Sequence, residues 1–138
     1  MHKHGQITRA AEAKSLEVFR NFIEYECQGS SGMDEGLIYD LKLAMDEACT
    51  NIITHGYAEM NPGSIMVELD LLPNQAAISI TDFGHPFEPS EAPRPDVEAS
   101  LDGQPTGGFG LFIIYQTMDK VHYSVDECGN HLVLTKYF

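Results

Sequence analysis

The chain has 138 residues, 43% of them hydrophobic, and a formal net charge of −13 from 21 acids and 8 bases. A chain of this length hides roughly two-thirds of its unfolded surface on folding, so we expect a single domain over residues 1–138. Such an acidic surface repels a polyphosphate strand, which argues against nucleic acid as a partner. No stretch reaches the roughly 18 to 20 apolar residues of a membrane span, and the first residues lack the apolar core of a signal peptide, so we expect no membrane association and a cytoplasmic location.

Two helices are predicted in the first half of the chain. Apolar residues three and four apart predict one helix over residues 10–27 and a second over residues 34–55. The second begins at Asp34, a residue type that caps helix N-termini, and ends before Gly56, a residue type common just after a helix.

Strands are predicted as two hairpins. Apolar and polar residues alternate over residues 64–72, and after a Pro-Asn turn a partner strand follows over residues 76–81. Two closing strands are expected near residues 120–126 and 131–137. Because the strands come in hairpins instead of alternating with helices, we predict an α+β fold, a two-layer α/β sandwich with the helices on one sheet face.

A long loop and a short helix separate the two hairpins. Residues 85–106 hold five of the seven prolines and show no period. Loops longer than about 12 to 15 residues are uncommon in compact domains unless they act as lids or binding loops, so we interpret this segment as a lid. A short apolar helix is expected over residues 111–118.

The second predicted helix carries an acid and an amide one turn apart. Glu47 and Asn51 lie beside its apolar stripe, at the border of the core. The amide oxygen of Asn51 could bind hydrated Mg²⁺ while Glu47 takes a proton from an incoming hydroxyl. The alternative is a surface acid beside a helix-end amide, since polar pairs at this spacing are common.

Two glycine-containing motifs follow. Asp82, at the end of the predicted hairpin, could accept a hydrogen bond from an exocyclic amine, with Gly84 leaving room for a base; a simple Asp turn is the alternative. The glycine cluster at residues 107–110 could cradle phosphate at a helix start, or could be a flexible joint. It lacks the Gly-Lys-Ser/Thr ending of a P-loop.

Taken in order, these motifs resemble the GHKL (Bergerat-fold) ATP-binding superfamily. Within it, the chain is similar to the anti-sigma-factor serine/threonine-protein kinase family of bacterial partner-switching systems, which has a histidine-kinase-like ATPase domain. The resemblance is carried by LAMDEACTN at 43–51, HGY at 55–57, DFGHPFEP at 82–89 and GGFGLF at 107–112. It implies a mostly antiparallel mixed sheet with helices on one face and an ATP lid at about 85–106.

The resemblance also implies a role for each matching residue. Glu47 matches the catalytic acid that activates the attacking hydroxyl, and Asn51 the amide that binds Mg²⁺. Asp82 matches the carboxylate that reads adenine, with Gly84 beside the base. The residues that match the phosphate-facing turn and its flanks are Gly107, Gly108, Phe109, Gly110 and Leu111.

The family transfers the γ-phosphoryl group of ATP to a serine or threonine of a STAS-type anti-sigma-factor antagonist. It also sequesters a sigma factor, commonly as a homodimer, so the resemblance implies ATP and Mg²⁺ as cofactors and these proteins as partners.

The chain departs from the family in its cations. Family kinases tend to carry a basic residue just before the second glycine motif, where this chain has Gln104-Pro105-Thr106. Arg94 is the only base between Phe83 and Asp119, so it is our candidate for the phosphates, with a cation lent by a partner as the alternative. A non-catalytic, nucleotide-gated protein-binding module and a scaffold without ligand are therefore kept as alternatives to the kinase.

Overall fold

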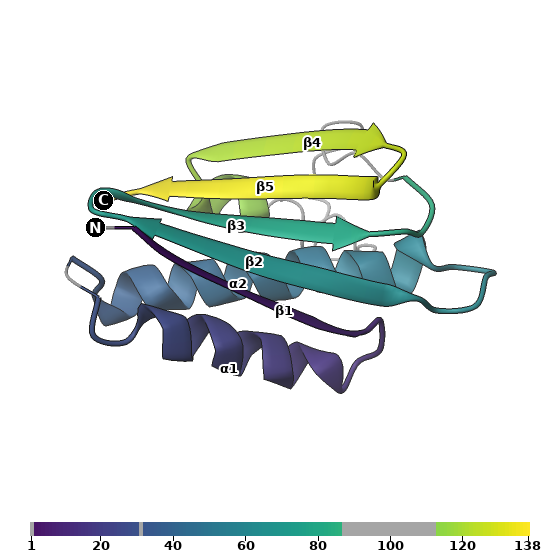
Figure 1. The fold of residues 1–138 in the computed structure, drawn as a ribbon, viewed down its shortest axis with the longest axis horizontal. Helices are drawn as coiled ribbons and strands as arrows, with labels where there is room; N and C mark the ends of the chain where they lie inside the picture. The colour runs from purple at the N-terminus through teal and green to yellow at the C-terminus, as the bar shows by residue number, and fades with distance from the viewer. Residues whose placement is uncertain (1, 31, 87–112) are drawn as a thin grey trace, which may run out of the picture.

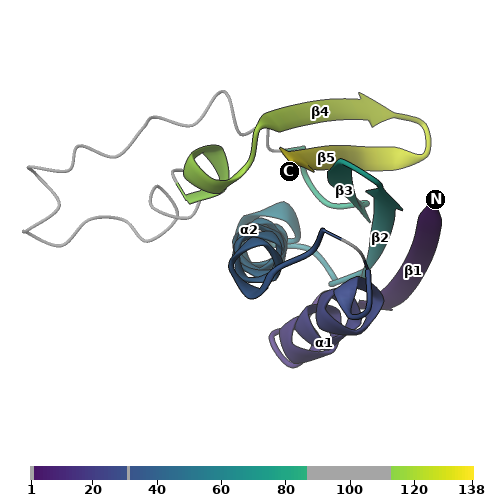
Figure 2. The same cartoon turned by 90° about the vertical axis from the view of Figure 1, so that its left-hand side faces the viewer.

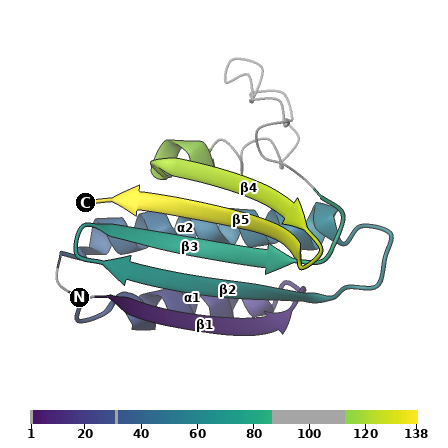
Figure 3. The same cartoon turned by 45° about the horizontal axis from the view of Figure 1, so that its top comes forward.

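The computed structural model describes residues 2–30, 32–86 and 113–138, which form one five-stranded sheet and two long helices (Figure 1). The elements in chain order are β1 (Lys3–Ala10), α1 (Ser15–Cys27), α2 (Glu35–Asn51), the π-helical turn η1 (Ile52–Gly56), β2 (Ser64–Leu72), β3 (Gln75–Asp82), β4 (Lys120–Asp126) and β5 (Gly129–Tyr137). The strand order is β1-β2-β3-β5-β4, which Figure 3 shows face on.

Both long helices cover the same face of the curved sheet (Figure 2). Phe19 and Ile23 of α1 and Leu41 of α2 are fully buried there, because apolar residues three and four apart form one stripe on each helix. The alternating residues of β2, such as Ile65 and Val67, meet them from the sheet. This confirms the predicted α+β two-layer sandwich. All pairs among the described strands are antiparallel, so the mixed pairing we expected is not found among them.

The first strand, β1, was not predicted from the sequence. We expected a helix from residue 10, whereas β1 extends to Ala10 and α1 begins at Ser15. The side chains of β1 are mostly exposed and Ile7 is the one that packs against the core, so no alternating apolar pattern marks the strand. Pairing with β2 along the whole strand defines β1 instead.

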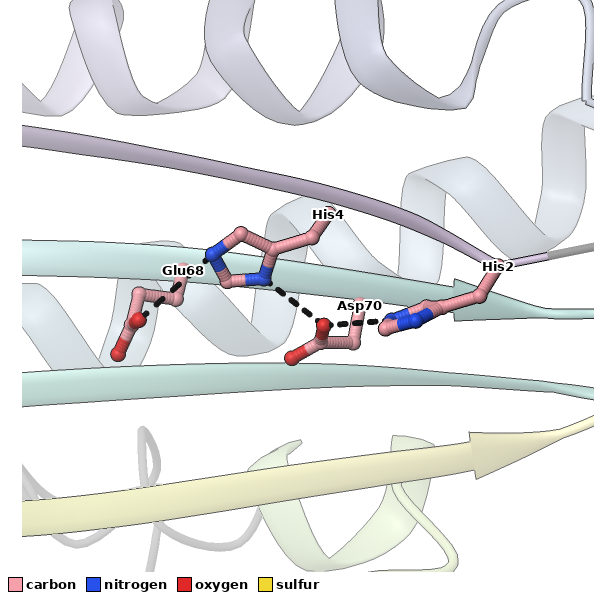
Figure 4. Close-up of polar contacts among 4 residues, drawn as sticks. All are labelled: His2, His4, Glu68 and Asp70. Atoms are coloured by element: carbon pink, nitrogen blue, oxygen red, sulfur yellow. Dashed lines mark hydrogen bonds and ion pairs between the residues drawn. The ribbon is translucent and has the colours of Figure 1, made fainter.

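The outer face of the sheet adds polar contacts that connect β1 to β2. His2 Nε2 and His4 Nδ1 each lie 2.8 Å from Oδ1 of Asp70, and His4 Nε2 lies 3.9 Å from Glu68 Oε1 (Figure 4). These four residues form the outer-face cluster.

The second helix is confirmed, with a different ending. Asp34 caps it as predicted, because its carboxylate accepts a hydrogen bond from the Leu37 backbone N–H at 2.8 Å. The α-helix ends at Asn51, and the remaining residues that we assigned to it form the wider turn η1. Glycine at position 56 ends that turn.

The remaining predictions agree with the structure where it describes them. β2 and β4 have the predicted bounds, β3 is one residue longer at each end, and β5 begins two residues earlier. The short helix is present over residues 113–117. Nearly all of the predicted lid and the glycine cluster, residues 87–112, lie outside the described residues. No helix in the described ranges is both long and apolar enough to cross a membrane.

Candidate functional site

The C-terminal end of α2 carries the predicted acid and amide. Glu47 is half-buried, and its pKa is raised by burial and by the charge of the neighbouring Asp46. Asn51 is only 9% exposed, and its Nδ2 is the one buried side-chain nitrogen or oxygen without a hydrogen-bond partner in the described part of the chain. Because buried polar groups are almost always paired, such an amide is a candidate ligand-binding group.

An ion pair between the helices lies next to Glu47. Arg20 of α1 donates a hydrogen bond from Nη1 to Oδ1 of Asp46 at 2.5 Å, with both side chains partly buried. Thr50 Oγ1 donates to the Asp46 carbonyl at 2.7 Å. This pair offsets a negative charge beside Glu47 and fixes α1 against α2, a contact that the sequence reading did not identify.

Asp82 ends β3 as a buried carboxylate with fixed contacts. It is 6% exposed, and its Oδ1 accepts hydrogen bonds from the Gly84 backbone N–H at 2.8 Å and from Asn130 Nδ2 at 3.0 Å. The same amide nitrogen donates to the Gly84 carbonyl at 2.9 Å. Both hydrogen bonds to the carboxylate from described residues therefore reach one oxygen, Oδ1.

Gly84 has a packing role that the sequence did not indicate. A Cβ at this position would lie 2.3 Å from the Gly56 carbonyl oxygen, far inside van der Waals contact. His85 donates its backbone N–H to the same oxygen at 2.5 Å. The glycine thus lets the residues after β3 lie directly against η1, and its predicted place beside a base stays a prediction.

Gly56 brings the two parts of the site together. A Cβ at Gly56 would lie 3.7 Å from Asp82 Oδ1, so η1, which continues α2 beyond Asn51, contacts the end of β3. Figure 1 shows η1 beside the C-terminal end of that strand. Glu47 and Asn51 on α2 consequently lie at the same end of the sheet as Asp82, the last residue of β3, and Gly84, which follows it.

The roles of two residues at this corner, Tyr57 and Asn130, were missed by sequence reasoning. The Tyr57 hydroxyl donates to the Ser64 carbonyl at 2.8 Å and accepts from the Phe83 N–H at 3.0 Å, which fixes the chain just after Asp82. Asn130, 4% exposed, holds the carboxylate of Asp82 from β5. The sequence reading placed Asn130 in the turn before the last strand, and a single asparagine there gives no signal of such a contact. The remaining predicted site residues lie outside the described residues: Arg94, Gly107, Gly108, Phe109, Gly110 and Leu111.

The sequence that carries these groups matches a known domain. A sequence model of the histidine kinase-like ATPase domain matches residues 9–136. The chain belongs to this family. The match covers nearly all of the sequence and spans both halves of the site.

Curated relatives within this ATPase family are protein kinases by name. Serine-protein kinase RsbW of Bacillus thuringiensis (strain Al Hakam) is 35% identical over 104 residues, which cover 72% of this chain and 64% of the relative. Serine/threonine-protein kinase BtrW of Bordetella bronchiseptica is 32% identical over 101 residues, covering 73% and 71%. The chain thus spans less than two thirds of the length of RsbW. These relatives confirm the resemblance to the anti-sigma-factor kinase group of the superfamily.

A solved structure has the same fold. The crystal structure of the RsbU and RsbW domains of Rv1364c from Mycobacterium tuberculosis matches with a TM-score of 0.69 and 19% sequence identity, over 98% of this chain and 32% of that chain. At this identity the likeness concerns the fold, and it agrees with the predicted GHKL architecture.

Proposed function

We propose that this protein is an ATP-dependent serine/threonine-protein kinase that phosphorylates a STAS-type anti-sigma-factor antagonist and binds a sigma factor, acting as a cytoplasmic homodimer. The observation that carries the proposal is the pair on α2: a half-buried carboxylate, Glu47, one turn before a buried amide, Asn51, whose nitrogen has no hydrogen-bond partner among the described residues. Names of relatives at 32% and 35% identity support the reaction class.

Asn51 fits the binding of Mg²⁺ that the family implies. Its amide is buried, and its nitrogen has no hydrogen-bond partner among the described residues, so these residues do not hold the amide at both ends. Among the described residues no group of three histidine, cysteine or acidic side chains could hold a metal ion. Mg²⁺ commonly takes few protein ligands and completes its shell with water and substrate phosphates, so one amide oxygen suits it. Bound Mg²⁺ would offset the negative charge of the phosphates.

Glu47 would act as the base. As the serine Oγ forms its bond to the γ-phosphorus, the bond from that phosphorus to the bridging oxygen breaks and ADP leaves with the electron pair. The hydroxyl proton moves to Glu47, whose raised pKa makes it a stronger base than an ordinary glutamate. Since only the carboxylate form accepts the proton, the rate falls as the pH drops through this raised pKa.

The test is transfer of labelled phosphate from Mg-ATP to candidate antagonists. Glu47→Gln should slow transfer by roughly 10² to 10⁴, the span typical of a lost general base, while nucleotide binding persists. The matched control is Asp40→Asn, an acid two turns earlier on α2, which should transfer at the wild-type rate. Wild-type transfer by Glu47→Gln would refute the assigned role.

A nucleotide-gated binding module is the second candidate, favoured by the absence of a base in the sequence Gln104-Pro105-Thr106 before Gly107. Tight binding of ATP and antagonist with no phosphoserine formed would support the module over the kinase.

A further inference from the structure

We propose that Asn130 is a positioning residue that holds Asp82 in the one orientation that selects a 6-amino purine over a 6-oxo purine. The inference rests on the proposed function, because it assumes that a purine nucleotide binds next to Asp82. It assigns the selectivity to a residue on the last strand, outside every motif that the sequence reading singled out.

Asn130 is built into the corner with no freedom to turn. It pairs directly with Asp82 in the register of β3 and β5, and it is 4% exposed. Its two amide hydrogens go to two acceptors, Asp82 Oδ1 at 3.0 Å and the Gly84 carbonyl at 2.9 Å. An amide rotated by half a turn would present its own oxygen to these two acceptors, so the network permits a single orientation.

This arrangement fixes the plane of the Asp82 carboxylate. Oδ1 accepts hydrogen bonds from the Gly84 backbone N–H at 2.8 Å and from the Asn130 amide. One donor follows the end of β3 and the other lies at the start of β5. Rotation of the carboxylate would break both hydrogen bonds inside a buried corner, which costs more than losing them in water. Oδ2 is therefore the oxygen held ready for a ligand.

A carboxylate oxygen accepts hydrogen bonds and donates none. The exocyclic amine of adenine supplies a donor, whereas the 6-oxo group of hypoxanthine is itself an acceptor and repels the carboxylate. A 6-oxo purine also carries a hydrogen on N1. A carboxylate free to turn or shift could accept a hydrogen bond from this N1–H group. Holding Asp82 in place prevents this alternative hydrogen bond to a 6-oxo purine. Asn130 would therefore contribute to selectivity without touching the base.

The test compares the dissociation constants of ATP and inosine triphosphate, which differ only in the 6-substituent and the proton on N1, by calorimetry in the presence of Mg²⁺. Asn130→Asp keeps the side-chain size but removes the donor, and Asn130→Ala is the second variant in case the like charges prevent folding. Each should reduce the preference for ATP on the order of 10-fold or more, through weaker binding of ATP, tighter binding of inosine triphosphate, or both.

The matched control is Thr81→Val. Thr81 is also buried at the end of β3 and hydrogen-bonds His131 of β5 at 3.1 Å, one residue from Asp82 and Asn130. If Asn130 had a purely structural role, its substitution would weaken the binding of both nucleotides equally. We expect Thr81→Val to affect the two nucleotides equally in this way. An unchanged ATP preference in a folded Asn130 variant overturns the inference and leaves the proposed function standing. If the wild type binds neither nucleotide, both are overturned.

Discussion

At the scale of single residues, the corner around Asp82 depends on close contact between two backbones. Gly84 and Gly56 come from the chain after β3 and from η1, and the two backbones approach so closely that Gly84 has no room for a Cβ. The Tyr57 hydroxyl and the Asn130 amide fix the same corner from two further elements. The site is therefore sensitive to changes too small to alter charge or hydropathy.

Replacing Gly84 by alanine tests this close contact. Its Cβ would lie 2.3 Å from the Gly56 carbonyl oxygen, and a backbone atom cannot move aside as a flexible side chain can. We expect Gly84→Ala to lower the free energy of unfolding by about 1–3 kcal/mol, as overpacking does, measured by urea denaturation.

The control is the same substitution at Gly36 in the first turn of α2, where the added Cβ would lie 3.6 Å from the nearest atom, Asp34 Oδ1. Alanine should be neutral there or stabilise by up to about 1 kcal/mol, because it has the higher helix propensity. Equal effects of the two substitutions would show that Gly84 is not constrained by contact.

At the scale of elements, β1 is held mainly by its neighbour. It is an edge strand with mostly exposed side chains, so backbone pairing with β2 and a few side-chain contacts keep it in place. On the helix side, Lys3 Nζ donates to the Glu26 carbonyl at 2.9 Å. On the other side, the outer-face cluster connects His2 and His4 to Asp70.

Protonation controls the outer-face cluster. The hydrogen bond to Asp70 raises the pKa of His4 from its ordinary value of 6.5. Burial acts to raise the pKa of Asp70, but the hydrogen bonds from His4 and His2 outweigh it, and the pKa falls below its ordinary 3.8. Because the pKa of His4 is raised, this histidine stabilises the fold at pH values below 6.5. The stabilisation is lost as the pH rises through the pKa of His4 in the folded state. A lowered aspartate pKa stabilises above 3.8 and loses the effect as the pH falls through the folded value.

The contribution of the cluster is consequently largest between these two ordinary values. His4→Asn should lower the melting temperature more at about pH 5.5 than at about pH 8.5, because histidine is charged only in the first condition. His122→Asn is the control, on the exposed side of the other edge strand, β4, where no carboxylate partner is found among the described residues. Equal losses at both pH values for His4→Asn would refute the linkage.

At the scale of the whole molecule, charge opposes the proposed ligand. The net charge is −13, and residues 1–20 hold four of the eight bases, so the rest of the chain is still more acidic. ATP is itself an anion, and a like-charged surface disfavours its approach. Neutralisation by Mg²⁺ is therefore expected to matter for affinity as well as for transfer.

Melting with nucleotide tests the nucleotide binding on which both functional accounts depend. A ligand that binds only the folded state at 100 times its dissociation constant stabilises by about 2.7 kcal/mol, which corresponds to several degrees in a chain of this size. We expect Mg-ATP to raise the melting temperature by that order, ATP with a chelator to raise it less, and Mg²⁺ alone to leave it unchanged. No shift at millimolar Mg-ATP would leave only the scaffold account.

The elements that could be predicted are those whose signal is local. Asp34 caps α2 through a hydrogen bond that spans three residues, and β2 alternates strictly because one face of it meets the core. β1 could not be predicted, since Ile7 is its one side chain packed against the core. The turn η1 was read as ordinary helix because its backbone widening leaves no mark on the apolar spacing.

The amino-acid order is enough to reveal the fold class, the family and the residues Glu47, Asn51, Asp82 and Gly84, because spacing along a helix or after a strand follows from local geometry. The surroundings of these residues follow from the three-dimensional packing. Asn130 is 48 residues from Asp82 and Tyr57 is 26 from Phe83, and it is the pairing of β3 with β5 and the approach of η1 that bring them into contact. Contacts between residues so far apart in the chain depend on the whole fold, so no local pattern could reveal them.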